Sequence, residues 1–288
     1  MRKSDKVAIV CCSNGQRISY ADKIQQLQKT LEEIGLTPVF SEFIYEKEFV
    51  FSGSKEERSE SLMNFYRDEK IKVIFDISGG DIANEILPYL DFELIAQSGK
   101  QFWGYSDLTT IINAIYTKTG KASVLYQVRN LIYKDAKKQI ADFTNTIFQN
   151  DELLYEKSDL FDFSYQFVQG NKMKGVVVGG NIRCLLKLAG TEYFPDMTGK
   201  ILLLEAYGGT VAQMTTYLNQ LKQMGVFDKI NGILLGTFTE MEEKECEPTM
   251  AELVKRYAGE MIPVAKTAEI GHGTDAKGII IGKKLVLE

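Results

Sequence analysis

The sequence around Ser106 has the pattern of a strand that turns sharply into a helix. An apolar run, Phe102–Gly104, leads into Tyr105-Ser106-Asp107, and a helical pattern begins at once with Leu108. A serine on such a turn has its hydroxyl lifted clear of the sheet, beside the backbone N–H groups of the helix start. This geometry suits a serine nucleophile. A Ser-Asp pair is also an ordinary helix cap, and the spacing alone favours the cap.

Two further residues could complete a serine-based mechanism. His272 is the single histidine of the chain and lies between two glycines, and imidazole is the usual general base near neutral pH. Glu205 closes the apolar run Ile201–Leu204, where a carboxylate could orient an imidazole. The plainer alternatives are a loop histidine and an acid that pairs with a local arginine or caps the next element.

Other polar and glycine-rich segments are less specific. Gly79-Gly80 follows a predicted strand and could be a simple turn or could expose a backbone N–H to an oxyanion. Gly179-Gly180-Asn181 lacks the Lys-Ser/Thr ending of a Walker loop and the spacing of a dinucleotide fingerprint. The glutamates between residues 240 and 247 are typical of a solvated face or loop.

The composition is that of an ordinary globular protein of one large or two modest domains. The chain has 288 residues, of which 44% are hydrophobic and 25% charged, enough to bury a core. A net charge of −5 without a basic stripe argues against nucleic acid as the main partner. Because no stretch approaches a membrane span and Val7–Val10 is too short for a signal-peptide core, we expect a cytoplasmic protein with no membrane partner.

The cysteines do not have the spacing of a metal site. Cys11 and Cys12 are adjacent, Cys184 and Cys246 stand alone, and one histidine cannot supply a usual zinc set. We therefore expect buried, reduced thiols, with no metal and no cofactor.

Apolar runs alternate with helical periodicity through the first half of the chain. The expected strands cover residues 7–11, 38–40, 72–77 and 102–105, and the expected helices cover 24–34, 58–68, 86–90 and 108–116. This α/β alternation predicts a mostly parallel sheet flanked by helices, with ligands at the carboxyl ends of its strands. Both Gly79-Gly80 and Ser106 lie at such ends.

The second half predicts a smaller, carboxyl-terminal α+β domain. Its expected strands cover 176–181, 201–205 and 230–236, with a helix around 211–224. Between about Asp135 and Lys174 the pattern loses any clear period. We therefore predict an amino-terminal domain over 1–150, a linker over 151–170 and a carboxyl-terminal domain over 171–288.

Six short segments, taken in order, resemble the LD-carboxypeptidase family, which includes the microcin C immunity peptidases. They are Gly79-Gly80, Leu87-Pro88-Tyr89-Leu90-Asp91, Gly104-Tyr105-Ser106-Asp107-Leu108-Thr109, Gly179-Gly180-Asn181, Leu202-Leu203-Leu204-Glu205 and Gly271-His272-Gly273. Each segment alone is weak, but six in the same order over nearly the whole length are specific.

The resemblance implies a metal-independent serine peptidase whose Ser–Glu–His triad is divided between two domains. Ser106 would be the nucleophile, His272 the base and Glu205 the residue that orients the base. The backbone N–H of Asp107, with one from Gly79-Gly80, would form the oxyanion hole. Members of the family are typically homodimers and cleave an amide next to a free carboxylate.

The resemblance also implies a small substrate. The leading class is a cell-wall (murein) peptide with an L-to-D amide before a terminal D-amino acid. The alternative is a microcin-C-like peptidyl or aminoacyl nucleotide, whose cleavage gives immunity. Ser78 stands where the cell-wall enzymes typically have an arginine before the Gly-Gly turn, which favours the alternative. A non-catalytic protein that binds a small ligand is a further alternative, against which a matched Ser, Glu and His argue.

Overall fold

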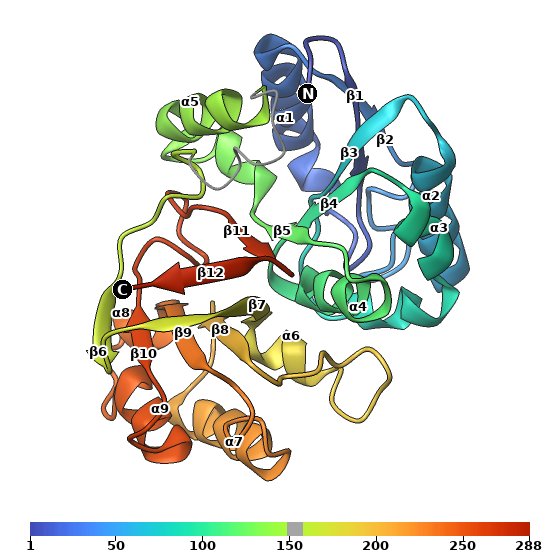
Figure 1. Cartoon of the computed structure of the whole chain (residues 1–288). Coiled ribbons are helices and arrows are strands. Elements are labelled where there is room, and N and C mark those ends of the chain that lie inside the picture. The colour runs from blue at the N-terminus through green and yellow to red at the C-terminus, as the bar shows by residue number, and fades with distance from the viewer. Residues whose placement is uncertain (149–157) are drawn as a thin grey trace.

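The computed structural model describes residues 1–148 and 158–288, which form two six-stranded sheets with helices around them (Figure 1). The strand order of the first sheet is β11-β5-β4-β3-β1-β2, and the pairs from β5 to β2 are parallel. Its strands are β1 (Lys6–Val10), β2 (Thr37–Phe40), β3 (Ile71–Asp76), β4 (Gln101–Gly104), β5 (Ser123–Leu125) and β11 (Ile279–Ile281). The mostly parallel α/β sheet expected from the sequence is confirmed.

Helices cover both faces of this sheet because successive residues of its strands point to opposite sides. On β1, Val7 packs in the same cluster as Leu27, whereas Ala8 packs in the same cluster as Leu62. The first helix ends at Gly35, whose φ of +105° suits glycine. The helices of this half are α1 (Ala21–Ile34), α2 (Lys55–Arg67), α3 (Phe92–Gln97), α4 (Thr109–Thr119) and α5 (Ala136–Ile147).

The helix α5 corrects an expectation, because the region after Asp135 has no clear period in the sequence. Its buried face includes Gln139, Asp142 and Thr146 beside Phe143. These polar side chains interrupt the apolar pattern, so the sequence does not predict the helix. Of the predicted linker, residues 151–157 lie outside the described residues, and so do 149–150 at the end of the predicted first domain.

The second sheet has the order β12-β7-β8-β9-β10-β6, with four parallel strands between two antiparallel edge strands. Its strands are β6 (Gln166–Gln169), β7 (Met173–Asn181), β8 (Lys200–Ala206), β9 (Gly232–Phe238), β10 (Val264–Lys266) and β12 (Lys284–Leu287). The helices are α6 (Ile182–Leu186), α7 (Val211–Gln223), α8 (Thr239–Glu243) and α9 (Met250–Ala258). This is the smaller second domain that the sequence predicts.

Hydrogen bonds tie the two sheets together next to the Ser106 turn. The side chain of Asn113 on α4 donates to the carbonyl of Gly179 and accepts from its N–H, at 2.9 and 2.8 Å. Thr109 Oγ1 accepts from the N–H of Asn181 at 3.0 Å. The chain also returns to the first sheet late, since β11 pairs with β5. The helix that follows Ser106 is therefore fixed against β7.

Across the described ranges, 1–148 and 158–288, the structure contains no helix with the length and apolar character needed to span a membrane.

Candidate active site

Ser106 lies on a strained turn between β4 and α4. Its φ is +56°, in the left-handed region that non-glycine residues rarely adopt, and such a conformation costs on the order of 1–3 kcal/mol. The turn is also tight, because a Cβ on Gly104 would lie 2.7 Å from Cβ of Leu108. No side-chain cap is formed at the start of the following 3-10 helix (Ser106–Leu108) or of α4. The interpretation of Ser106 as a helix cap is therefore wrong.

Ser106, His272 and Glu205 form one hydrogen-bonded chain. Oγ of Ser106 lies 3.2 Å from Nε2 of His272, and Nδ1 of His272 lies 2.6 Å from Oε2 of Glu205. A carboxylate only accepts, so the proton belongs on Nδ1 and leaves Nε2 of the neutral ring to accept from the serine hydroxyl. The side chains of His272 and Glu205 are 4% and 2% exposed. The three residues have the geometry required to activate a serine oxygen.

The imidazole is held by its loop and by two aromatic rings. Tyr105 and Tyr207 lie 4.7 and 5.4 Å from it, centroid to centroid. Gly271, directly before the histidine, has a φ of +147°, and a Cβ there would lie 1.9 Å from Oγ1 of Thr237. Thr237 also donates its N–H to the carbonyl of Ile270 at 2.8 Å. Only glycine lets this loop lie so close to β9.

Glu205 comes from the carboxyl end of β8, where the pairing with β9 is irregular. Its side chain is directed at His272 and forms no ion pair with an arginine in the described part of the chain. Its second oxygen, Oε1, is buried and has no hydrogen-bond partner within residues 1–148 and 158–288. Among the described residues the carboxylate of Glu205 therefore has the imidazole of His272 as its side-chain partner.

The Gly79-Gly80 turn lies beside the serine. A Cβ on Gly79 would lie 4.0 Å from Cβ of Ser106, and Gly80, with φ +120°, packs so tightly that a Cβ would lie 2.2 Å from Cγ of Asn14. Asn14 fixes the turn by donating its N–H to the carbonyl of Gly79 and accepting from the N–H of Asp81. Within the described residues the N–H groups of Gly79 and Gly80 have no acceptor. They are available to a substrate oxygen.

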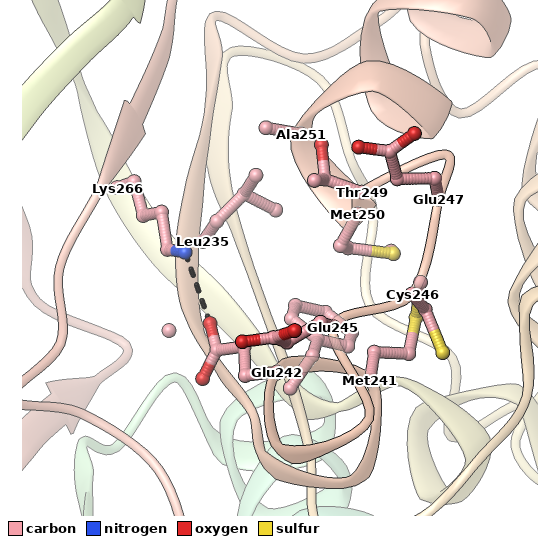
Figure 2. A pocket seen from close by; sticks show the side chains of 12 residues that line it. Leu235, Met241, Glu242, Glu245, Cys246, Glu247, Thr249, Met250, Ala251 and Lys266 are labelled. Carbon is pink, nitrogen blue, oxygen red and sulfur yellow. Dashed lines mark ion pairs between the residues drawn. The ribbon is translucent and has the colours of Figure 1, made fainter.

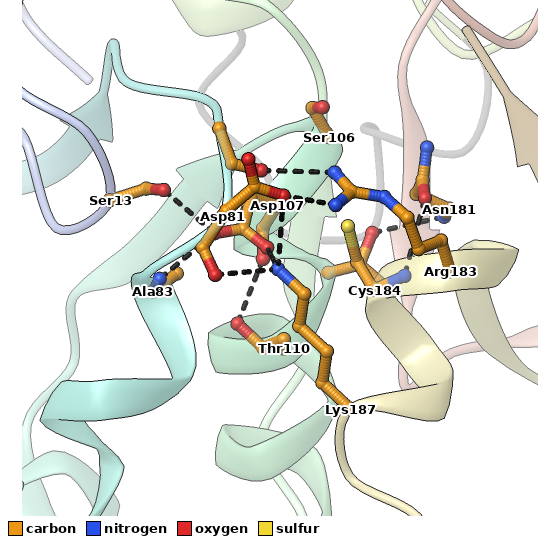
Figure 3. Close-up of polar contacts among 12 residues, drawn as sticks. Ser13, Asp81, Ala83, Ser106, Asp107, Thr110, Asn181, Arg183, Cys184 and Lys187 are labelled. Atoms are coloured by element: carbon orange, nitrogen blue, oxygen red, sulfur yellow. Dashed lines mark hydrogen bonds and ion pairs between the residues drawn. The ribbon is translucent and has the colours of Figure 1, made fainter. Parts of the chain in front are cut away.

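The side chain of Asp107 is wholly buried directly after the serine. It accepts from Oγ of Ser13 at 2.7 Å and from the N–H of Ala83 at 2.8 Å. It also pairs with Nζ of Lys187 at 2.5 Å, from the other domain (Figure 3). These contacts fix the backbone whose N–H is expected, from the family resemblance, in the oxyanion hole.

A second cation from the same segment, Arg183 on α6, holds the glycine turn (Figure 3). It pairs with Asp81 and donates from Nη2 to the carbonyl of Gly80 at 3.1 Å, while Lys187 donates to the carbonyl of Asp81 at 2.8 Å. The hydrogen bond from Arg183 lowers the pKa of the Asp81 carboxyl. Neither cation carries a motif in the sequence that would mark it as part of the site.

A cavity of about 530 Å³ opens over the serine. Ser106 and His272 lie on its wall, together with Arg129, Tyr207 and Glu240. The cavity lies at the carboxyl ends of β4 and β8, where ligands bind in sheets of this type. It is the candidate substrate site.

A second cavity, of about 370 Å³, lies beside α8 (Figure 2). Its floor is apolar, with Met241 and Met250, and Glu242 at its edge pairs with Lys266 at 2.9 Å. The four glutamates of this region other than Glu240 are exposed, as the expected solvated face requires. Glu240 instead lines the cavity over Ser106 and accepts the N–H of Gly209 at 2.6 Å.

The cysteines are free thiols. Burial raises the pKa of Cys11 and Cys12 well above the usual thiol value, and Cys184 is also buried. Cys246 departs from the expectation, since it is only half-buried. In residues 1–148 and 158–288 no three His, Cys, Asp or Glu side chains are grouped as a metal site.

Several known proteins are similar to this chain in both sequence and fold. The microcin C7 self-immunity protein MccF of Escherichia coli is 26% identical over 288 residues, covering 90% of this chain and 83% of the relative. The murein tetrapeptide carboxypeptidase of Pseudomonas aeruginosa is 25% identical over 275 residues, covering 93% and 89%. The crystal structure of an MccF-like protein from Bacillus anthracis strain Ames has a TM-score of 0.84 at 27% identity, covering 99% of this chain and 94% of that one.

Family models describe the two halves of the chain separately. The LD-carboxypeptidase N-terminal domain matches residues 7–126, which include Ser106. The LD-carboxypeptidase C-terminal domain matches residues 174–287, which include Glu205 and His272. Together with the relatives and the shared fold, these matches show that the chain belongs to the LD-carboxypeptidase family of peptidases.

Proposed function

We propose that this protein is a serine-type carboxypeptidase that hydrolyses an amide bond next to a free carboxylate. The observation that carries the proposal is the chain from Ser106 through His272 to Glu205, with contacts of 3.2 and 2.6 Å on a strained turn. Backbone strain of this kind persists where the surrounding structure enforces it, and it is concentrated at active sites.

The reaction would be acyl transfer through a covalent intermediate. Oγ of Ser106 attacks the amide carbonyl while Nε2 of His272 takes its proton. The same nitrogen then returns the proton to the leaving amine, and water, activated in the same way, releases the acyl group from the serine. Glu205 orients the imidazole and stabilises the positive charge that develops on it.

The oxyanion of the tetrahedral intermediate would be held by backbone N–H groups. Those of Gly79 or Gly80 and of Asp107 lie beside Ser106, and two cations from the other domain fix both segments. Donors that are already in place cost no reorganisation during the reaction, and one such donor accounts for about 10²–10³ in rate.

The leading substrate is a murein peptide with an L-to-D amide before a terminal D-amino acid. A relative at 25% identity is a murein tetrapeptide carboxypeptidase, and the cavity is large enough for a short peptide. An aminoacyl or peptidyl nucleotide is the second candidate, supported by the microcin immunity relative. Tyr207, 64% exposed on the cavity wall, favours this candidate because an exposed ring can stack on a base.

The domain division 1–150, 151–170 and 171–288 is part of the proposal, as are a homodimeric state and a cytoplasmic location. The matches to separate family models support a division between residues 126 and 174. Light scattering on the purified protein tests the dimer directly.

The function is tested by incubating the purified protein with an LD-tetrapeptide and with an aminoacyl sulfamoyl nucleoside. Mass spectrometry detects the released D-amino acid or nucleoside, and the Ser106→Ala protein is the control. Turnover that depends on Ser106 supports the proposal, and the preferred substrate decides between the two classes. Binding without turnover by the wild-type protein would instead identify a small-ligand binding protein.

A further inference from the structure

Arg129 lines the cavity over Ser106, and its guanidinium is held there by hydrogen bonds to neutral amide side chains. Its Nη1 donates to Oε1 of Gln16 at 3.0 Å and its Nε to Oε1 of Gln127 at 3.3 Å. Gln16 is itself buried and donates from Nε2 to the carbonyl of Ile77 at 3.1 Å. Amide oxygens hold the guanidinium in place without cancelling its charge. Within residues 1–148 and 158–288 no carboxylate forms an ion pair with Arg129.

The other charged groups on the cavity wall already have partners. Arg183 is paired with Asp81. Glu240 accepts the N–H of Gly209 and pairs with Lys244, both at 2.6 Å. Among the charged side chains that the structure describes around this cavity, the charge of Arg129 is the one left without a neutralising partner.

The start of α7, at the edge of the same cavity, has several of its N–H groups occupied by its own cap. The N–H of Gly209 is taken by Glu240. The N–H of Thr210 donates to Oε1 of Gln213 at 2.9 Å, and the N–H of Gln213 donates to Oγ1 of Thr210 at 3.3 Å. They are therefore less open to an anion than the N–H groups of an uncapped helix start.

Arg129 also acts close to the nucleophile. Burial raises the pKa of Tyr105, the residue before Ser106, and the positive charge of Arg129 opposes that rise. Arg129 and Ser106 line the same cavity, so the guanidinium faces the space in which a substrate on Ser106 would lie.

We propose that Arg129 recognises the free carboxylate of the substrate on the residue that leaves, and so makes this enzyme a carboxypeptidase. The inference rests on the proposed function and names the group that selects the substrate. A guanidinium can bind a carboxylate end-on through Nη1 and Nη2 with two parallel N–H···O bonds. Among the described residues Nη2 of Arg129 has no acceptor, and Nη1 gives one of its two hydrogens to Gln16 and keeps the other. A carboxamide has one oxygen and no charge. The carboxyl-terminal amide of the same peptide is therefore the control substrate for the free acid.

The test compares an LD-tetrapeptide with its carboxyl-terminal amide, using wild-type protein, Arg129→Gln and Arg129→Lys. We expect Arg129→Gln to lower kcat/KM for the acid by about 100-fold and for the amide by less than about 3-fold. Arg129→Lys keeps the charge but loses the planar fork, so its loss for the acid is intermediate. Lys137→Gln, an exposed cation on α5, removes the same net charge and should change neither value.

Equal losses on the acid and the amide in Arg129→Gln would overturn the inference and make Arg129 a structural residue. A loss confined to an aminoacyl nucleotide substrate would overturn it in favour of a phosphoryl group. If the wild-type protein cleaves neither the peptides nor the aminoacyl sulfamoyl nucleoside, the proposed function fails, and a binding measurement then tests the role of Arg129 separately. Calorimetry on Ser106→Ala, with and without Arg129→Gln, must then show tighter binding of the acid that depends on Arg129.

Discussion

Lys187, which follows α6 in the second domain, forms its ion pair with Asp107, the residue directly after Ser106 in the first. Nζ and Oδ1 are 2.5 Å apart, and the side chains are 17% and 0% exposed. A buried carboxylate is tolerated where hydrogen bonds and a counter-charge satisfy it. This pair therefore fixes the two domains at the point where the oxyanion hole is expected.

Breaking this pair should cost stability and activity together. Lys187→Met leaves the carboxylate of Asp107 buried without a counter-charge, so we expect a loss of about 3 kcal/mol in the free energy of unfolding. The double variant Lys187→Met/Asp107→Asn should recover part of the lost free energy of unfolding, since the buried charge is removed. Urea unfolding of both variants and their kcat values check this. Lys29→Met, from an exposed pair with Glu33, is the control and should change stability by less than about 0.5 kcal/mol. A loss in Lys187→Met no larger than in this control would contradict the prediction.

Substitutions of Ser106 should separate catalysis from strain. Ser106→Ala should reduce turnover by several orders of magnitude while ligand affinity is kept, because the triad acts as a unit. Ser106→Gly should be equally inactive but more stable than Ser106→Ala by about 1 kcal/mol, because glycine adopts a φ of +56° without strain. Thermal unfolding compares the two variants. Residual activity above about a tenth of wild type in either one would remove Ser106 from the nucleophile role.

The loop before the histidine should not tolerate a side chain. In Gly271→Ala the new Cβ would meet Oγ1 of Thr237 at 1.9 Å, so the loop must shift and carry His272 away from Ser106. We expect kcat to fall at least about 100-fold. Gly120→Ala is the control, since Gly120 also has a positive φ, +70°, but no atom of the described residues lies within 4 Å of its Cβ position. It should lower stability by about 1 kcal/mol and leave kcat unchanged. Normal kcat in Gly271→Ala would show that the loop can move without harm.

The elements and the reacting residues could be predicted where the signal is local. Apolar runs that end in Ser106 or Glu205 mark strand ends, and parallel strands bring such ends to one edge of a sheet. His272 is the one possible imidazole base because the chain has no other histidine, but the local pattern alone favours a loop histidine. Which of these residues touch could be taken only from the family resemblance, because spacing does not report contacts between domains.

The supporting residues could not be predicted for the same reason. Lys187 and Asp107 are 80 positions apart, and α6 has only five residues, too few to show a helical period. Arg129 lies in a 3-10 helix of five residues. Its partners, Gln16 and Gln127, are uncharged, so no pairing of opposite charges marks the contact in the sequence. The strand β11 is three isoleucines whose partner, β5, is equally short. Such contacts arise from the packing of the whole chain.

Activity should not depend on a divalent metal ion. The chain has one histidine, and its ring nitrogens are engaged by Ser106 and Glu205. The described residues hold no group of three side chains suited to a metal. We expect full activity after dialysis against EDTA, measured with the preferred substrate. A loss that zinc or another divalent ion restores would contradict the proposed mechanism.

Two aspartates near the active site should make opposite contributions to the dependence of stability on pH. Asp76 is buried at the end of β3, where it accepts from the N–H groups of Cys12 and Ser78. Burial raises its pKa despite these bonds. The pKa of Asp81 is lowered, chiefly by the hydrogen bond from Arg183.

The sign of each contribution follows from linkage. For Asp76 the contribution to stability is full below the unfolded value, near 3.9, and is lost as the pH rises through the raised folded pKa. For Asp81 the contribution is present above the unfolded value and is lost as the pH falls through the lowered folded pKa. Raising the pH from about 4 to 8 should therefore shrink any stability advantage of wild type over Asp76→Asn. Over Asp81→Asn the advantage should hold across that range and shrink as the pH falls below about 4. Urea unfolding of the three proteins at several pH values measures both trends, and parallel trends would show that burial does not control the ionisation of Asp76.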